Sequence, residues 1–194
     1  GFLAGVSSTL VGSRVAHAEV ASILNCGTAP RIGLYRPWME NLDEGWTRFV
    51  LEAGEFPYSS VRNAEVRAGD LRDRYDCLVL PSISAKAIVE GQAPGATEPR
   101  YVGGIGREGV ANLQPFVQDG GTLVCIDAAC NAAIELFGLP VVSVLEGLPH
   151  EEFFCRGSSL RIHVDTDHPV GYGMPEWASA YFHEAQALDM AARD

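Results

Sequence analysis

The stretch TLVCIDAACNAAIELFG, residues 122–138, decides the fold class of this chain. It begins with the continuous apolar run TLVCI, which is typical of a strand that is covered on both faces. It then turns directly into a helical pattern at residues 131–137 and ends at Gly138, a common helix stop. The run CLVL at residues 77–80 has the same strand character. Continuous apolar strands separated by helices predict a mainly parallel sheet in a doubly wound α/β layer.

Outward from this stretch, short apolar runs alternate with helical patterns. The pattern at residues 43–53 has apolar side chains at spacings of three and four residues, and it predicts that Trp46 turns into the core. We expect Asp43 to cap this helix and Gly45 to let another backbone approach it closely. The other predicted strands are residues 32–35, 58–61 and 160–164, and the other predicted helices are residues 14–24, 84–90 and 108–118. The strand at 32–35 is expected to be central in the sheet, and the alternating strand at 160–164 to lie near its edge.

A length of 194 residues suits one domain with a short extension. We interpret residues 1–30 as an N-terminal extension and residues 31–194 as a single domain. The 25 acidic residues exceed the 14 Lys and Arg, which gives a net charge of -11 and argues against nucleic acid as a partner. The chain has no apolar run of the ~20 residues that a membrane helix needs, and no targeting segment is visible in it.

In an open parallel sheet, ligands bind beside the carboxyl ends of the strands. The residues that follow the predicted strands are therefore the candidates for a ligand site. The candidate ligand-binding residues are Trp38, Glu40, Asp43, Glu44, Ser82, Ser84 and Asp127.

The turn at Asp127 has the form of a nucleophile elbow, in which a side chain on a sharp strand-to-helix turn faces a crevice. Asp127 is interpreted either as the N-cap of the following helix or as a catalytic nucleophile or base. In the catalytic interpretation, Glu44 or Glu40 is the acid/base partner, and Ser82 or Ser84 orients the reacting groups. This requires Glu44 and Asp127 to lie on the same sheet edge, within ~15 Å of each other.

Three further features carry weaker predictions. Cys130 lies one turn into the helix after Asp127 and is either a packed core thiol or a reactive one. GIGREG at residues 104–109 has the spacing G-x-G-x-x-G but lacks the strand that a dinucleotide site needs before it. HVDTDH at residues 163–168 has metal-capable groups but is more simply a turn. The five cysteines are odd in number and include no C-x-x-C, so we expect neither a metal nor a cofactor in this chain.

Several segments carry a resemblance to a known family, most specifically DEGWTR at residues 43–48 and YVGGIG at residues 101–106. With DCLVLPSIS and GSSLRIHVDTDHPVGYGMP, they resemble the C-terminal region of large bacterial zinc carboxypeptidase-like proteins, across roughly residues 31 to 182. In that group a metallopeptidase domain is followed by a class I glutamine amidotransferase-like domain. The resemblance implies a flavodoxin-like three-layer α/β/α sandwich with a mainly parallel sheet.

The same resemblance implies that this chain lacks both activities of such a protein. The zinc motif of the peptidase has no counterpart here, and Asp127 stands where the Cys nucleophile of the amidotransferase triad would lie. The expected function is therefore a non-catalytic accessory or ligand-binding domain. Its expected partners are the peptidase domain of the parent protein and a small-molecule or peptide ligand. Two alternatives stay open: a hydrolase or other small-molecule enzyme that uses Asp127 and Glu44, and an interaction or homo-oligomerisation module that uses the apolar N-terminal extension and Trp38.

Overall fold

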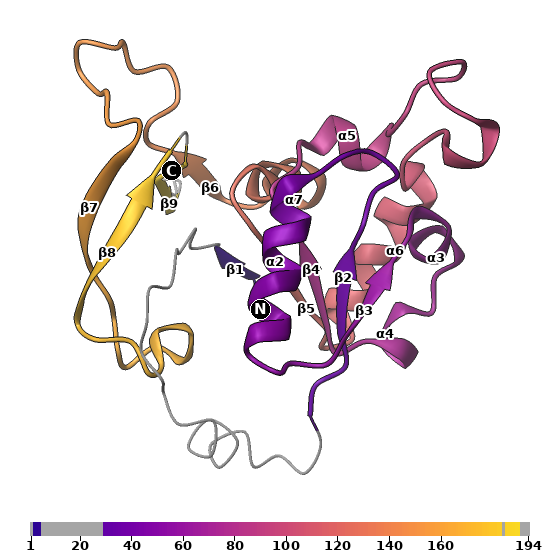
Figure 1. Cartoon of the computed structure of the whole chain (residues 1–194), viewed down its shortest axis with the longest axis horizontal. Coiled ribbons are helices and arrows are strands. Elements are labelled where there is room, and N and C mark those ends of the chain that lie inside the picture. Colours follow the sequence, from indigo (N-terminus) through magenta and orange to yellow (C-terminus); the bar gives the residue numbers. More distant parts are fainter. Residues whose placement is uncertain (1, 5–28, 184, 191–194) are drawn as a thin grey trace. The chain divides into compact units, whose positions relative to one another are not determined.

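The computed structural model of the chain describes residues 2–4, 29–183 and 185–190 (Figure 1). The described residues form two compact units. The first contains residues 2–4, 30–142 and 188–190, and the second contains 29, 143–183 and 185–187. The domain predicted for residues 31–194 is thus divided between the two units, and residues 2–4 of the predicted extension belong to the first. The helix predicted at residues 14–24 lies outside the described residues.

The first unit is built on a five-stranded parallel sheet with the strand order β1-β5-β4-β2-β3. Its strands are β1 (Phe2–Ala4), β2 (Ile32–Tyr35), β3 (Tyr58–Val61), β4 (Cys77–Leu80) and β5 (Thr122–Cys125). The four strands predicted here are confirmed, with β5 one residue shorter than expected. β2 lies inside the sheet between β4 and β3, but the middle strand is β4. Part of the predicted N-terminal extension, β1, belongs to the sheet, where it pairs with β5.

Helices occupy both faces of this sheet. They are α2 (Leu42–Ala53), α3 (Asn63–Ala68), α4 (Leu71–Arg74), α5 (Ala85–Val89), α6 (Gly106–Gln118) and α7 (Ala128–Phe137), with a 3₁₀ turn η1 (Pro99–Tyr101). From β2 to β3 the chain moves towards one edge of the sheet. From β3 to β4 and from β4 to β5 it moves towards the other edge. Because parallel crossovers are right-handed, α2 lies on one face and α3 to α6 on the other, as Figure 1 shows. The first unit therefore has the predicted flavodoxin-like three-layer α/β/α fold.

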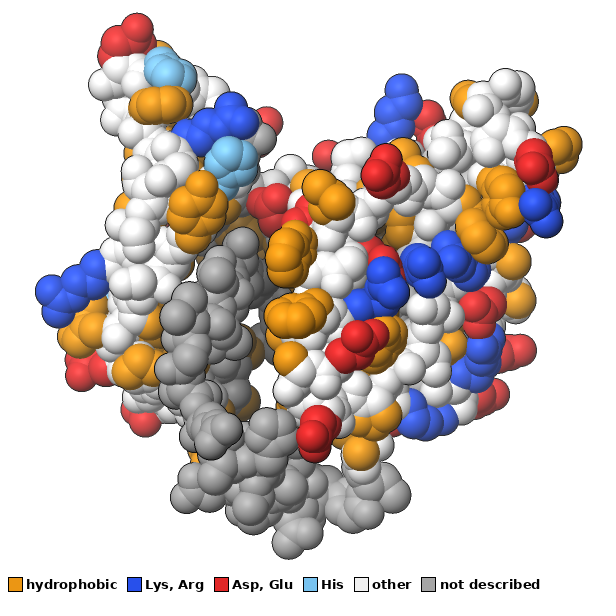
Figure 2. Space-filling model, viewed as in Figure 1, with side chains coloured by type: hydrophobic (Ala, Val, Ile, Leu, Met, Phe, Trp, Pro, Cys, Tyr) orange, Lys and Arg blue, Asp and Glu red, His pale blue; other side chains and the backbone are white. Residues whose placement is uncertain are grey.

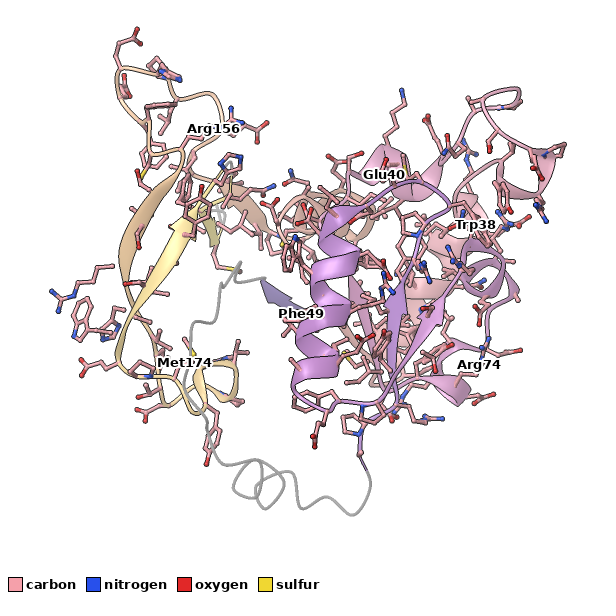
Figure 3. The ribbon with its side chains drawn as sticks, in the orientation of Figure 1. Trp38, Glu40, Phe49, Arg74, Arg156 and Met174 are labelled. Atoms are coloured by element: carbon pink, nitrogen blue, oxygen red, sulfur yellow. The ribbon has the colours of Figure 1, made fainter. Side chains whose placement is uncertain are left out.

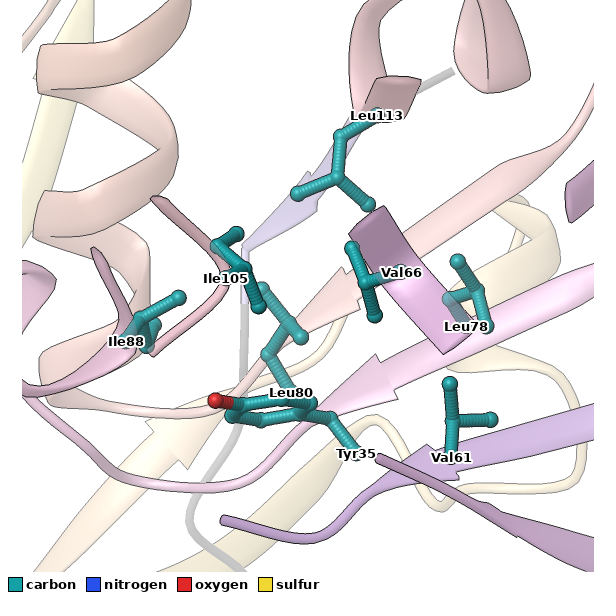
Figure 4. A pocket seen from close by; sticks show the side chains of 8 residues that line it. All are labelled: Tyr35, Val61, Val66, Leu78, Leu80, Ile88, Ile105 and Leu113. Atoms are coloured by element: carbon teal, nitrogen blue, oxygen red, sulfur yellow. The ribbon is translucent and has the colours of Figure 1, made fainter. Parts of the chain in front are cut away.

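The main core is built by residues of the sheet together with residues of the helices α3 to α7. Gly33 is required there, because a Cβ at this position would lie 2.7 Å from Leu78 Cδ2 and 2.8 Å from Val61 Cγ2. This core encloses a void of about 10 Å³ (Figure 4). The side chains around it are Tyr35, Val61, Val66, Leu78, Leu80, Ile88, Ile105 and Leu113. A space of this size is at the lower limit for one water molecule, so it is a packing defect rather than a ligand site.

Helix α2 is rotated relative to the prediction from its sequence pattern. Trp46 is 65% exposed and Phe49 60% exposed, whereas Glu44 is only 4% exposed. Phe49 lies on the side of α2 that is turned away from β2 (Figure 3). The prediction that Trp46 turns into the core is wrong: the face that carries Glu44 points inward, where Glu44 lies 3.7 Å from Arg36 in the loop after β2.

The start of α2 also differs from the prediction. Its N-cap is Asn41, whose side-chain oxygen accepts a hydrogen bond from the backbone N–H of Glu44, so the prediction that Asp43 caps the helix is wrong. A Cβ built on Gly45 has no described heavy atom within 4 Å, so the close backbone approach expected at this residue is not found among the described residues.

In the second unit, β7 (Ser158–His163) and β8 (Trp177–Phe182) form an antiparallel pair, and η2 (Pro169–Gly171) lies between them in sequence. The strand predicted at residues 160–164 exists, but it pairs with β8 rather than at the edge of the parallel sheet. β6 (Val141–Ser143) pairs with β9 (Leu188–Met190) in another two-stranded sheet. Within residues 2–4, 29–183 and 185–190, no helix has both the length and the apolar character needed to span a bilayer.

Candidate functional site

Asp127 occupies a sharp turn between β5 and α7, at the carboxyl end of the parallel sheet. Its backbone has φ 47° and ψ -113°, a combination that residues other than glycine rarely adopt. Hydrogen bonds hold the turn on both sides: Ile126 N donates to Leu80 O at 3.0 Å, and Cys130 N donates to Asp127 O at 2.8 Å. Such strain persists only where surrounding contacts fix it, and it is common at functional turns. The structure thus contains the strand-to-helix elbow that the sequence predicts.

The two carboxylate oxygens of Asp127 have different surroundings. Oδ2 accepts a hydrogen bond from Ser82 Oγ at 2.8 Å. Oδ1 is buried and has no hydrogen-bond partner among the described residues. Asp127 occupies the N-cap position of α7, as one interpretation predicts, but its side chain makes no capping hydrogen bond to the helix. A buried acceptor without a partner is costly, and a ligand that donates a hydrogen bond to Oδ1 would remove that cost.

Asn41 connects this elbow to the start of α2. Its side-chain amide donates to Ser82 O at 3.0 Å, and its carbonyl oxygen accepts from Glu44 N at 2.7 Å. A chain of hydrogen bonds therefore runs from Asp127 through Ser82 and Asn41 to the backbone of Glu44. The loop after β2 and the elbow after β5 lie on the same edge of the sheet, as expected for parallel strands.

The Glu44 side chain interacts with basic groups instead of with Asp127. Its Oε1 lies 3.0 Å from Arg48 Nε and 3.7 Å from Arg36 Nε. The Arg48 contact is short but poorly angled, since neither atom has a partner with hydrogen-bond geometry. The charge of Glu44 also acts on Arg62, which follows β3, although burial and then the charge of Arg36 leave the pKa of Arg62 lowered. The structure thus pairs Asp127 with Ser82 and Glu44 with arginines.

The remaining candidates are spread around this edge. Trp38 stacks against the guanidinium of Arg62, 3.8 Å from its ring centre, and packs 4.8 Å from the ring of Tyr101 (Figure 3). Glu40 and Asp43 are exposed. Ser84 caps α5 by accepting a hydrogen bond from Ala87 N at 3.2 Å, which gives this residue a structural role.

Cys130 is a core thiol by its contacts. It is 7% exposed, and its Sγ donates to Cys125 O at 3.3 Å. Burial raises the pKa of the neighbouring Cys125 thiol to about 12. These surroundings favour a neutral thiol over a reactive thiolate, in line with the packing interpretation.

The two weaker motifs have structural roles in the described residues. A Cβ on Gly104 would lie 2.2 Å from Ile88 O, so this glycine of G-x-G-x-x-G serves the close packing of its loop against α5. His163 lies 3.4 Å from a Glu176 oxygen. The part of the chain that the structure describes contains no cluster of three His, Cys, Asp or Glu side chains that could hold a metal ion.

Sequence reasoning missed two residues of this edge, Asn41 and Arg62. Asn is a preferred N-cap, and Asn41 stands directly before an acidic first turn, so a search for caps could have found it. Arg62 carries no local signal, because its role depends on Trp38, 24 positions earlier in the sequence.

A scan of protein-family models and a search of curated proteins each found no match to this chain. The chemistry of the site is therefore argued from its geometry. That geometry provides a strained turn with one free carboxylate acceptor, a hydroxyl that orients the carboxylate, and a nearby group of arginines.

Proposed function

We propose that this chain is a non-catalytic, ligand-binding accessory domain of a larger zinc carboxypeptidase-like protein, with a class I glutamine amidotransferase-like origin. One observation carries the proposal: the elbow position holds Asp127, with one oxygen bound by Ser82 and the other buried without a described partner. A turn of this kind presents its side chain to a ligand crevice.

The absence of acyl-transfer chemistry follows from the residue at the elbow. Glutamine hydrolysis in class I amidotransferases requires a thiolate at this turn, and the carboxylate of Asp127 is a much poorer nucleophile. The two nearest thiols along the chain, Cys125 and Cys130, are both buried, and Cys130 donates to the backbone carbonyl of Cys125. The elbow is thus suited to accept a hydrogen bond from a bound molecule.

The proposed partners are the peptidase domain of the parent protein and a ligand that carries a hydrogen-bond donor. A protonated amino group, as found in a small metabolite or at the N-terminus of a peptide, matches the charge and the acceptor geometry of Asp127. The net charge of -11 also favours cationic over anionic groups in the approach to the molecule.

The test combines an activity assay with a binding assay on the full chain. We expect no ammonia release from glutamine. We expect thermal stabilisation by a panel of primary amines and short peptides, and Asp127→Asn should weaken the best of them at least tenfold. Asp119→Asn is the matched control, because Asp119 is exposed and precedes the opposite end of the same strand. Glutamine hydrolysis that disappears in Cys130→Ser, or amine binding that is unchanged in Asp127→Asn, contradicts the proposal.

A second candidate function is a hydrolase in which Asp127 acts as nucleophile or base. The hydrogen bond from Ser82 favours it, because a fixed orientation is what a catalytic carboxylate needs. Hydrolysis of nitrophenyl esters that is lost in both Asp127→Asn and Ser82→Ala would support this function over the first.

A further inference from the structure

We propose that Arg36, Arg62 and the exposed ring of Trp38 form a binding site for an oxyanion, a carboxylate or phosphate, carried on an aromatic group. The inference deepens the proposed ligand-binding function, on which it rests, and uses other residues of the same sheet edge. Arg36 follows β2 and Arg62 follows β3, so both lie at the carboxyl ends of adjacent strands, where open α/β sheets bind ligands.

Positive charge is in excess at this place. Arg36 and Arg48 approach the carboxylate of Glu44 within 4 Å, and Arg62 interacts with the same charge at longer range. The next carboxylate, Glu65, has its own cation in Arg74. Among the described residues, the charges of Arg36, Arg48, Arg62 and Arg74 thus exceed those of Glu44 and Glu65 by two, in a protein whose net charge is -11. In Figure 2, basic side chains gather on one face, over the region of β2 and β3.

Glu44 neutralises its arginines only in part. The Glu44 oxygen that approaches Arg48 Nε and Arg36 Nε forms no hydrogen bond of good geometry, and Arg48 Nε has none either among the described residues. Arg36 keeps 40% of its side chain exposed and approaches Glu44 only to 3.7 Å. Its guanidinium therefore retains donors for an incoming anion, and an arginine fork matches a carboxylate or phosphate in two-point contact.

Arg62 is held in place before any ligand arrives. Its Nη1 donates to Arg36 O at 3.1 Å and to Pro37 O at 3.0 Å, and its plane lies over the Trp38 ring. Burial, and then the charge of Arg36, lower the pKa of Arg62, so the two cations repel each other. A bound anion would relieve this repulsion, and a pre-organised guanidinium lowers the entropic cost of binding.

Trp38 and Tyr101 indicate that the second part of the ligand is an aromatic group. Trp38 is 40% exposed, and the Tyr101 ring lies 4.8 Å from it at an angle of 47°. An aromatic ring attached to the anion can stack on the open part of this pair, which adds binding free energy beyond that of the buried area. The site is thus expected to prefer aromatic oxyanions to inorganic ones.

The experiment titrates the full chain with benzoate, phenyl phosphate and inorganic phosphate and follows Trp fluorescence and calorimetric heat. We expect benzoate and phenyl phosphate to bind more tightly than inorganic phosphate, and Arg36→Gln to weaken all three at least tenfold. Trp38→Leu should weaken the two aromatic ligands and leave inorganic phosphate within about twofold. A preference for benzoate or for phenyl phosphate then distinguishes a carboxylate from a phosphate ligand.

Arg161→Gln is the matched control, because Arg161 also stacks on a tryptophan, Trp177, at 4.2 Å, but belongs to β7 in the second unit. Arg36→Gln keeps the backbone carbonyl that holds Arg62, and circular dichroism checks its fold. Binding that is unchanged in Arg36→Gln, or equally reduced in Arg161→Gln, overturns the inference. Asp127→Asn should keep oxyanion binding, so a failure at the elbow and a failure at the arginines give different results.

Discussion

At the scale of single residues, Asp127 combines an unusual backbone with a specific side-chain contact. At φ 47° and ψ -113°, a Cβ is strained by about 1–3 kcal/mol, whereas glycine is not, although glycine costs about 0.5–1 kcal/mol in chain entropy. We expect Asp127→Gly to be more stable than Asp127→Ala by about 1 kcal/mol in urea unfolding, because both lose the Ser82 bond and only one relieves strain. At residue 128, the first helical position, the order should be reversed: Ala128→Gly should be less stable than the wild type, which has alanine there. Equal stability of the two Asp127 variants would contradict the backbone strain inferred at this residue.

Asp76 gives a residue-scale prediction about pH. Hydrogen bonds from the Arg31 side chain, then from its backbone, and from Arg72 hold the pKa of the Asp76 carboxyl well below its usual range. Because the folded pKa is lower than the unfolded one, the carboxylate stabilises the fold above pH ~4, and this contribution is lost as the pH falls below that value. We expect Asp76→Asn to be less stable than the wild type at pH 7 and the difference to shrink towards pH 2. A constant difference across this range would contradict the linkage.

At the scale of elements, α2 turns an apolar stripe outward and a glutamate inward. Trp46 is therefore expected to contribute little to stability, and Trp46→Ser should change the free energy of unfolding by less than about 0.5 kcal/mol. Leu34, which is fully buried in β2, is the matched comparison, and Leu34→Ala should cost about 2–5 kcal/mol. Urea unfolding of the two variants measures both values. A large loss in Trp46→Ser would show that another surface covers this side of α2.

At the scale of the whole molecule, the two ends of the segment 143–187, which belongs to the second unit, lie side by side. Val144 N donates to Ala187 O at 2.9 Å, and the flanking strands β6 and β9 pair with each other. A short linker in place of residues 145–186 should therefore leave the parallel sheet and its helices intact. We expect this variant to keep a helical circular dichroism spectrum and one cooperative thermal transition. Loss of cooperativity would contradict the independence of the first unit.

The sequence by itself determined the parallel α/β layer, because its signals are local. The runs at residues 77–80 and 122–126 are continuously apolar, shorter than a typical buried helix and followed by turn residues, which predicts covered strands. The carboxyl-end rule then placed Ser82 and Asp127 on one edge, where a hydrogen bond joins them. The elbow was visible for the same reason, since it is a strand, one turn and a helix in direct succession.

Only the tertiary structure decided which face of α2 points inward and what each site side chain contacts. Periodicity shows that a helix has an apolar face, but the direction of that face depends on contacts distant in sequence. In α2 the buried face carries Glu44, which meets Arg36 from the loop after β2, and the apolar stripe that contains Trp46 is exposed. The pairing of Arg62 with Trp38 and the position of β1 beside β5 likewise join segments far apart in the chain, which no local pattern encodes.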